Sequence, residues 1–413
     1  MPANHGPQPG AAPMPRSLVA LLASASGLSV ANVYYAQPLL DALAAEFSIG
    51  HAAIGGVITA TQVGCALALL LLVPLGDRMD RRRLMGLQLA ALVVALVGVS
   101  LAGSPVALLL GMLAVGLLGT AMTQGLIAYA ATAAAPTERG RVVGAAQGGV
   151  VIGLLLARVQ AGVVADLAGW RGVYLVSALA MLALGAVLWR VLPAQLPPAQ
   201  RLSYPQLILS MFTLLRRERV LQIRGLIALL MFAAFSIFWS ALVLPLSAPP
   251  HGLSHTLIGA FGLVGVVGAL AAARAGHWAD RGRGQWVSGA ALALLLASWL
   301  PLSLVSQSLW WLVVGIVALD LAGQAIHVTN QSMVLHTQPQ AHSRLVGCYM
   351  LFYCVGSGLG ALGSTAAYAA FGWPGVCLLG AAVSALALAF WAGTLRHMPR
   401  TAHAPPGAEM AGI

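Results

Sequence analysis

Apolar stretches of about 20 residues recur along the whole chain and are separated by short polar segments. Each stretch is long enough to cross the ~30 Å hydrocarbon core of a bilayer as an α-helix. A helix pairs its backbone groups internally, whereas the strands of a membrane barrel would be shorter and would alternate apolar and polar residues. We therefore predict an all-α membrane protein with twelve transmembrane helices, at 17–40, 52–75, 84–103, 106–131, 142–165, 173–192, 224–246, 255–275, 286–305, 310–334, 344–366 and 374–395.

The second half of the chain repeats the first at a constant offset of 203 residues. Asp77-Arg78 recurs as Asp280-Arg281, and Gly169-Trp170 recurs as Gly372-Trp373. Parallel repeats in a membrane chain favour a transporter, because two similar bundles can rock about a site between them. We expect two parallel-repeat six-helix bundles, at 17–192 and 224–398.

The two predicted bundles are joined by residues 193–223, where four prolines prevent one continuous helix. Within this cytoplasmic linker, residues 206–219 place apolar side chains near one face, which predicts a short helix lying on the membrane surface. Residues 1–16 and 399–413 are expected to be disordered tails. The start of the chain also has features of a signal peptide, but its cleavage would leave eleven spans.

Only 8% of the residues are charged and 60% are hydrophobic, so lipid is the solvent for most of the chain. The net charge of +11 comes from arginine, and with both termini cytoplasmic, 19 of the 21 arginines fall in or beside cytoplasmic segments. This positive-inside asymmetry sets the predicted orientation. Because the high content of Ala, Gly and Arg suggests a GC-rich bacterial genome, we predict a multi-pass protein of the bacterial inner membrane. The expected partners are the lipid bilayer and a small-molecule solute; we expect no nucleic acid and a functional monomer.

The sequence shows no pattern typical of a metal or cofactor site. Its four cysteines lie inside apolar segments without a CxxC spacing, which favours buried packing over metal binding or disulfides. The ten acids are scattered, and no HExxH motif or Walker loop is present. An integral membrane enzyme or sensor is therefore a remote alternative to a non-enzymatic transporter that needs no cofactor and uses the proton gradient.

A polar loop after the second predicted span carries a specific motif, Val73-Pro74-Leu75-Gly76-Asp77-Arg78-Met79-Asp80-Arg81-Arg82-Arg83. It resembles the cytoplasmic loop signature of the major facilitator superfamily, Gly-x-x-x-Asp-Arg-x-Gly-Arg-Arg, with Val73 and Asp80 in place of the two glycines. An Asp at a helix end can pair with arginines or cap a neighbouring helix, so such a cluster can hold one conformation closed. We predict a gating role for Asp77, Arg78, Arg81 and Arg82 and for the second copy, Asp280 and Arg281. The alternative is that the arginines only enforce topology.

Within this superfamily the chain is similar to the twelve-span bacterial drug and metabolite exporters, which work as drug:proton antiporters. The similarity lies in Asn32 to Leu40 of the first span and in Asp320 to Gln331 of the tenth. The fifth span departs from the antiporter pattern, because Gly148 to Gly153 lacks the proline of Gly-Pro-x-x-Gly-Gly. This departure leaves the direction of transport open.

Asp320 lies about 11 residues into the tenth span, roughly 16 Å deep, which is near the centre of a bilayer. An ionised carboxylate there costs ~2.5 kcal/mol or more unless it faces water or a partner, so we predict a proton-coupling acid. Gln324, His327 and Gln331 follow on the same helical stripe, with Asn330 to its side. This polar stripe predicts a wet cavity that holds substrate or protons; the alternative is a structural network between helices.

Arg158, in the outer third of the fifth span, is the only arginine that we place away from the ends of the predicted spans. It is either a counter-charge for a substrate or acid, or an arginine that snorkels to the outer interface near Asp166. The family resemblance implies that the first, fourth, seventh and tenth helices line a central cavity. It thereby adds Asn32, Tyr35 and Gln124 to the predicted site. It also implies that the fifth helix packs against the eighth and the second against the eleventh.

These patterns together predict an alternating-access transporter that couples proton movement at Asp320 to the export of a small amphipathic compound. An uncoupled facilitator or an importer with the same fold is the main alternative.

Overall fold

The computed structural model describes residues 14–135, 137–193, 203–268, 277–278, 281, 283–338 and 342–397. Within these ranges every regular element is a helix and no strand occurs. The folded part begins slightly before the predicted boundary at residue 17. Met14 is already buried, and its backbone N–H donates to the Glu138 carboxylate at 2.9 Å.

The first half of the chain folds into one group of helices, with these bounds: α1 (Arg16–Tyr34), α2 (Leu40–Glu46), α3 (His51–Ile54), α4 (Gly56–Leu67), α5 (Arg81–Ser100), α6 (Pro105–Ala133) and α7 (Arg139–Val191). A linker helix, α8 (Tyr204–Arg217), leads to the second half. That half contains α9 (Arg219–Ala241), α10 (Val243–Ser247), α11 (His255–Ala260), α13 (Gly284–Ala297), α14 (Trp299–Ser303), α15 (Leu309–Leu335) and α16 (His342–Thr394).

Nine helices among the described residues are long and apolar enough to cross a membrane. Two of them, Arg139–Val191 and Ser343–His397, span more than 50 residues each and contain two of the predicted spans. Each is interrupted by a glycine in the left-handed region, Gly169 with φ 70° and Gly372 with φ 65°. Only glycine adopts this conformation readily, so the repeated Gly-Trp motif marks the same kink in both halves. The described part of the eighth span is the apolar segment His255–Gly268, and the arrangement is consistent with twelve spans.

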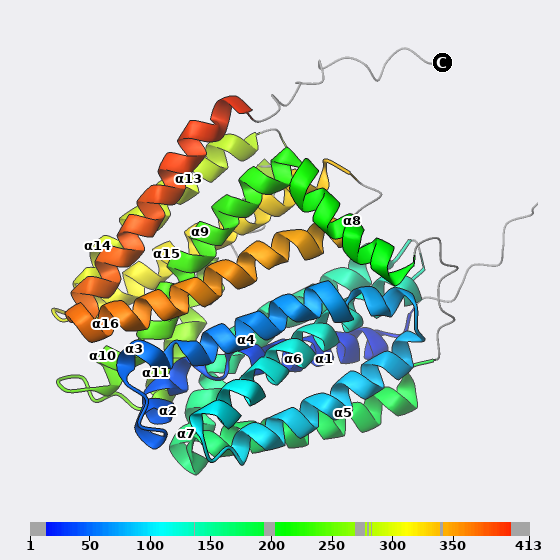
Figure 1. The fold of residues 1–413 in the computed structure, drawn as a ribbon, viewed down its shortest axis with the longest axis horizontal. Coiled ribbons are helices and arrows are strands. Elements are labelled where there is room, and N and C mark those ends of the chain that lie inside the picture. Colours follow the sequence, from blue (N-terminus) through cyan, green and yellow to red (C-terminus); the bar gives the residue numbers. More distant parts are fainter. Residues whose placement is uncertain are drawn as a thin grey trace, which may run out of the picture.

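The two halves lie side by side (Figure 1), in blue to green and in green to red. Helix α4 packs against α16, and α7 packs against α11, which are the pairs that the family resemblance implies. Glycines bring these backbones together. A Cβ added at Gly162 would lie 2.2 Å from the His255 carbonyl oxygen, and one added at Gly259 would lie 2.2 Å from that of Arg158. The small residues therefore permit direct backbone contact between the halves.

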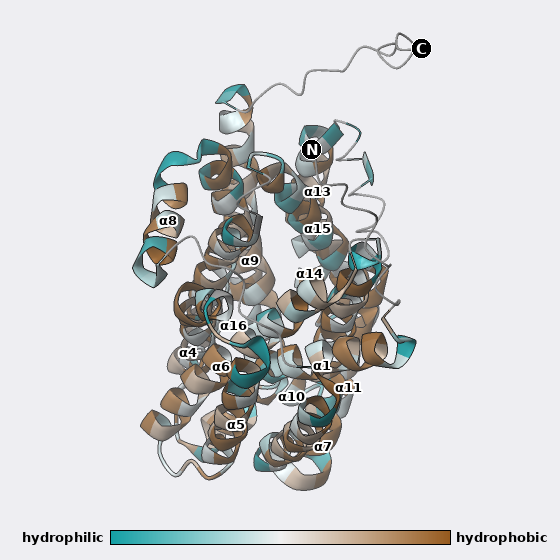
Figure 2. Ribbon diagram, turned by 90° about the vertical axis from the view of Figure 1, so that its right-hand side faces the viewer, coloured by the Kyte–Doolittle hydropathy of each residue, from teal (hydrophilic) through white to brown (hydrophobic). Residues whose placement is uncertain are grey.

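Helix α8 lies beside one end of the bundle, which we call the linker end (Figure 1). The opposite end, near α2, α3, α10 and α11, is called the far end. Figure 2 shows hydrophobic residues along most of α5 and α7, with hydrophilic residues gathered near helix ends. This distribution is the one expected for helices that contact lipid along their length.

The sequence predicts that the linker helix lies on the membrane surface. In the structure, α8 also packs against the protein. Its apolar residues Met211 and Leu214 are buried against Leu345 and Tyr349 of α16. At its start, the Tyr204 hydroxyl donates to the Leu71 carbonyl of the first half at 2.8 Å. Part of the predicted apolar face thus packs against the second half, and the start of the helix contacts the first half.

Candidate functional site

The predicted acid Asp320 lies in α15 and is only 5% exposed. Its neighbours on the eighth span are glycines. A Cβ added at Gly265 would lie 2.5 Å from Asp320 Oδ2, and one added at Gly268 would lie 2.9 Å from Asp320 Cβ. Its other oxygen, Oδ1, has no hydrogen-bond partner. The glycines of the eighth span thus leave space for the Asp320 side chain, and one oxygen of its carboxyl lacks a hydrogen-bond partner.

Arg158 reaches the same region from α7 of the other half and is 3% exposed. Its Nε donates to Gln37 Oε1 at 3.0 Å. The guanidinium lies over the Trp239 ring at 4.1 Å and near the Tyr34 ring at 5.5 Å. These contacts hold the charge inside the protein, so the alternative of an arginine that snorkels to the outer interface is wrong.

Asp320 and Arg158 interact electrostatically across the boundary between the halves. No ion pair within 4.0 Å joins these two described residues, and Arg158 Nη2 is unpaired, like Asp320 Oδ1. The indole N–H of Trp239, also buried, makes no hydrogen bond of normal geometry, although the ring lies close to the Asp320 carboxyl. We call Asp320, Arg158, Trp239 and Tyr34 the central site.

The other residues of the predicted polar stripe differ in burial and contacts. Gln324 and Gln331 are half-buried. His327 Nδ1 lies 3.1 Å from the Tyr349 hydroxyl and the ring meets Phe232 edge-on, with centroids 5.4 Å apart. Asn330 is fully buried inside the second half. Asp320 thus belongs to the central site, whereas His327 and Asn330 take part in the packing of α15 against its own bundle.

Asn330 accepts a hydrogen bond from a residue that the sequence did not single out. Arg224 of α9 is 0% exposed, and its Nη1 donates to Ser288 Oγ at 2.9 Å and to Asn330 Oδ1 at 3.3 Å. Arg158 is thus not the only cation buried within the helices. Arg224 was counted with the cytoplasmic arginines because it is the first residue of a predicted span.

The other predicted cavity residues occupy different places. Asn32 accepts from the Ser177 hydroxyl at 2.6 Å, inside the first half. Tyr35 is buried at 1% exposure, whereas the adjacent Tyr34 faces the other half and its hydroxyl lies 2.5 Å from that of Tyr353. The tyrosine of this motif that contacts the other half is therefore Tyr34 and not the predicted Tyr35. One residue of shift along a helix turns the side chain by about 100°.

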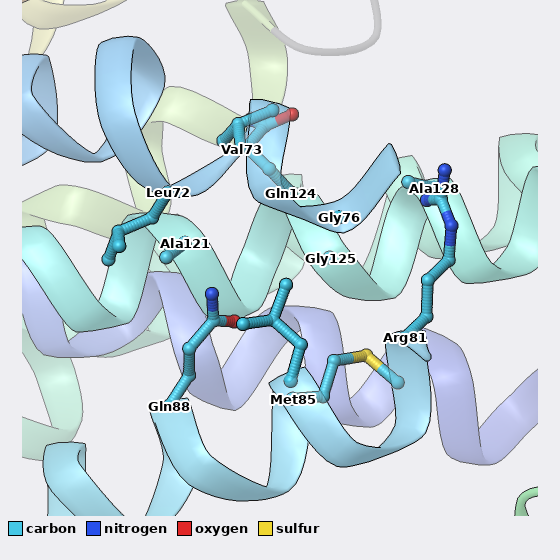
Figure 3. Close-up of a pocket in the computed structure, with 11 residues that line it drawn as sticks. Leu72, Val73, Gly76, Arg81, Met85, Gln88, Ala121, Gln124, Gly125 and Ala128 are labelled. Carbon is cyan, nitrogen blue, oxygen red and sulfur yellow. The ribbon is translucent and has the colours of Figure 1, made fainter. Parts of the chain in front are cut away.

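Gln124 lines a pocket at the linker end of the first half (Figure 3). The pocket lies between the end of the second span, α5 and α6. Its lining residues are Leu72, Val73, Gly76, Arg81, Leu84, Met85, Gln88, Ala121, Gln124, Gly125 and Ala128. Gln88 Oε1 has no hydrogen-bond partner, and the predicted gating residue Arg81 contributes to the wall.

The loop motif is well placed to fix the start of α5. Asp80, which replaces the family's glycine, caps this helix by accepting from the Arg83 backbone N–H at 2.9 Å. Arg82 donates to the Trp189 carbonyl and lies over the Trp189 ring at 4.7 Å, which ties α5 to α7. Arg78 and Arg281 are exposed. The side chain of Asp77 and the whole of Asp280 lie outside what the structure describes.

A polar cluster at the far end joins the halves, and sequence reasoning missed it. His255 Nε2 lies 3.1 Å from Asp41 Oδ1, and its Nδ1 lies 3.2 Å from Asp166 Oδ1. Asp166 also accepts from the Thr256 backbone N–H at 2.8 Å and from its hydroxyl at 2.6 Å. Burial raises the pKa of Asp166, but the hydrogen bonds from Thr256 and His255 outweigh it and hold the pKa below its usual value. We call Asp41, Asp166, His255 and Thr256 the far-end cluster.

Both ring nitrogens of His255 face carboxylate oxygens, which only accept hydrogen bonds when ionised. A neutral imidazole can donate from one nitrogen only, so the geometry fits the doubly protonated, charged form. His255 belongs to the second half and both acids belong to the first. The charged form of His255 therefore strengthens the contact between the two halves at the far end.

No group of three or more His, Cys, Asp or Glu side chains in the described ranges is placed to hold a metal. Cys65, Cys348, Cys354 and Cys377 are buried, as the sequence predicted, and their thiols are free.

Two groups of long apolar helices, a duplicated Gly kink and buried charges between the groups are typical of a membrane transporter. The Major Facilitator Superfamily model matches residues 21–288 and 224–412, and the chain belongs to this family. It is 41% identical over 382 residues to the Uncharacterized transporter YgaY of Escherichia coli O157:H7. The aligned residues cover 91% of this chain and 95% of that protein.

Solved transporters share the fold at low sequence identity. A bacterial homologue of the human lysosomal transporter Spinster, in an inward-facing and occupied conformation, matches with a TM-score of 0.76 and 16% identity, over 94% of this chain and 98% of that one. The nucleoside transporter NupG matches with a TM-score of 0.73 and 13% identity, over 92% of this chain and 100% of that one.

Proposed function

We propose that this chain is a proton-coupled, alternating-access transporter that exports a small amphipathic compound, with Asp320 as the proton-binding residue. The observation that carries the proposal is the buried carboxyl of Asp320, whose Oδ1 has no hydrogen-bond partner and which interacts with Arg158 across the boundary between the halves. An acid in this position senses both the proton and the relative position of the bundles.

Proton binding changes the force between the halves. With Asp320 ionised, its charge attracts Arg158 in a poorly screened environment and favours the arrangement in which the two lie close. Protonation removes that attraction, so a proton shifts the equilibrium between the two facing states. Substrate and proton then compete for the same carboxyl, which is the requirement for antiport.

The ends of the bundle have matching roles in this proposal. The predicted charge asymmetry assigns the linker end, with the loop arginines, to the cytoplasm, so the far end faces outward in the inner membrane and both termini are cytoplasmic. The far-end cluster and the hydrogen bond from Thr59 to the Gly358 carbonyl, 2.8 Å long, then form the outer closure. The motif around Asp77 to Arg82 would stabilise the opposite closure at the cytoplasmic end.

The proposal is tested with Asp320→Asn in the purified chain reconstituted into liposomes as a monomer. A growth screen of an efflux-deficient strain first supplies a transported compound. An imposed pH gradient should drive uptake of that compound by the wild type and by Glu46→Gln, a control acid that pairs with Arg171 at the surface. Asp320→Asn should lose gradient-driven accumulation. Net transport that is unchanged when the gradient is dissipated would instead support an uncoupled facilitator or importer.

A further inference from the structure

The central site holds two buried opposite charges that do not pair with each other. Arg158 Nη2 and Asp320 Oδ1 are both without a hydrogen-bond partner, and both side chains are at least 95% buried. Leaving buried charged atoms unsatisfied is costly, and a partner that satisfied both would be strongly stabilised. Such a partner must accept from the guanidinium and donate to the carboxylate.

A single inorganic ion cannot do both, since it would satisfy one charge and repel the other. A neutral solute with one polar group would leave one atom unpaired. Two groups of opposite sign on one molecule match the site, because they pair with both residues and keep the net charge of the region at zero.

The walls of the site are aromatic. Trp239 lies under the Arg158 guanidinium, Tyr34 lies beside it, and the Phe235 ring lies 6.2 Å from that of Trp239. The Trp239 indole N–H is a further unpaired donor next to the acid. Aromatic walls with a few polar groups are typical of sites for solutes with an apolar body.

We propose that the transported solute is a zwitterion with an apolar body, of the chemical class of the apolar amino acids. Its ammonium group binds Asp320 and its carboxylate binds Arg158. The inference rests on the proposed function and specifies the solute of that same site. Protonation of Asp320 removes the acceptor for the ammonium group and leaves a net positive site, so proton and solute exclude each other.

The test measures binding of radiolabelled L-phenylalanine to the full-length protein in liposomes, with three competitors. Unlabelled L-phenylalanine should compete. L-phenylalanine methyl ester, a cation, and N-acetyl-L-phenylalanine, an anion, should each compete at least about a hundredfold more weakly, because each leaves one buried charge unpaired. Equal competition by either analogue, or no binding of phenylalanine, leucine or methionine, would overturn the zwitterion assignment.

Two variants separate recognition from folding. In Arg158→Gln, the methyl ester should compete almost as well as phenylalanine. In Asp320→Asn, the N-acetyl form should compete almost as well as phenylalanine. The control Arg171→Gln, at the far-end surface, should change neither. If Arg158→Gln aggregates, Arg158→Lys keeps the charge and should retain the preference for the carboxylate. Unchanged selectivity in both site variants would contradict the proposal.

The failure of this inference is distinguishable from failure of the proposed function. A compound that is not a zwitterion, but whose accumulation still depends on the pH gradient and on Asp320, would refute the solute class and leave proton coupling intact.

Discussion

His255 and Asp166 connect the two halves of the molecule at the far end, with Nδ1 3.2 Å from Oδ1. The same imidazole reaches Asp41 through its other nitrogen at 3.1 Å. One side chain of the second half thus bridges two acids of the first, and all three are partly shielded from solvent.

Removing the imidazole should open the far end. We expect His255→Ala to weaken its closure by about 1.5–3 kcal/mol, the usual contribution of hydrogen bonds between charged groups. Double electron–electron resonance measures the distance between spin labels at the exposed positions Leu167 and Leu300, one in each half. This distance should be longer in His255→Ala than in the wild type. Thr213→Ala, on the linker helix, serves as a control. An unchanged distance distribution would show that the cluster does not hold the halves together.

The same distance should depend on pH in a particular way. Because hydrogen bonds outweigh burial and depress the pKa of Asp166, its contribution to closure is complete above the ordinary pKa of an aspartate and is lost as the pH falls through the depressed value. Deprotonation of His255 removes the second contribution as the pH rises. Closure should therefore be greatest at intermediate pH. A monotonic response would contradict this account.

The close backbone contact at Gly259 should not tolerate a side chain. A Cβ there would lie 2.2 Å from the Arg158 carbonyl oxygen, so Gly259→Ala must push α11 away from α7. We expect a loss of roughly 1–3 kcal/mol in stability and a loss of transport. Gly393→Ala, an exposed helical glycine with no described atom within 4 Å of the added carbon, is the matched control. Thermal unfolding in detergent gives the melting temperatures of the two variants. Equal melting temperatures for Gly259→Ala and Gly393→Ala would refute the close contact at Gly259.

Arg224 and Asn330 should be coupled energetically. Asn330→Leu leaves a buried guanidinium with one fewer acceptor and should destabilise the protein by roughly 1–3 kcal/mol. Adding Arg224→Met removes the buried charge, and an apolar replacement of similar size should restore much of that stability. A double-variant cycle in thermal unfolding gives the coupling, and additive effects would mean that the two residues act independently.

Much of the fold follows from local features of the sequence. Span length is set by the bilayer, and the repeat at a fixed offset places Gly169 and Gly372 at equivalent kinks. The burial of Asp320 could also be predicted, because its position within an apolar stretch determines its depth. These properties depend on a residue and its neighbours along the chain.

The contacts of the central site could not be predicted in the same way. Trp239 and Arg158 meet from different halves, and their stacking depends on how two bundles are docked. The two residues lie in different helices, so no helical periodicity in the sequence indicates that they meet. The choice between Tyr34 and Tyr35 depended on the rotation of a single helix, which an apolar helix without a strong polar face leaves undetermined.

The far-end cluster and Arg224 were missed for a related reason. His255 and Asp166 each begin or end a span, where polar residues are usually solvated. Arg224 follows a group of basic residues that topology explains on its own. Only the three-dimensional packing distinguishes these side chains from ordinary residues at a membrane surface.

Proton release on solute binding tests the central claim most directly. In weakly buffered detergent solution with a pH indicator, addition of a transported compound to the wild-type protein should release protons, with an amount that falls as the pH rises and Asp320 is already ionised. At a compound concentration high enough to saturate the variant, Asp320→Asn should release no protons. Equal proton release from the variant would contradict the assignment of Asp320 as the residue that couples protons to transport.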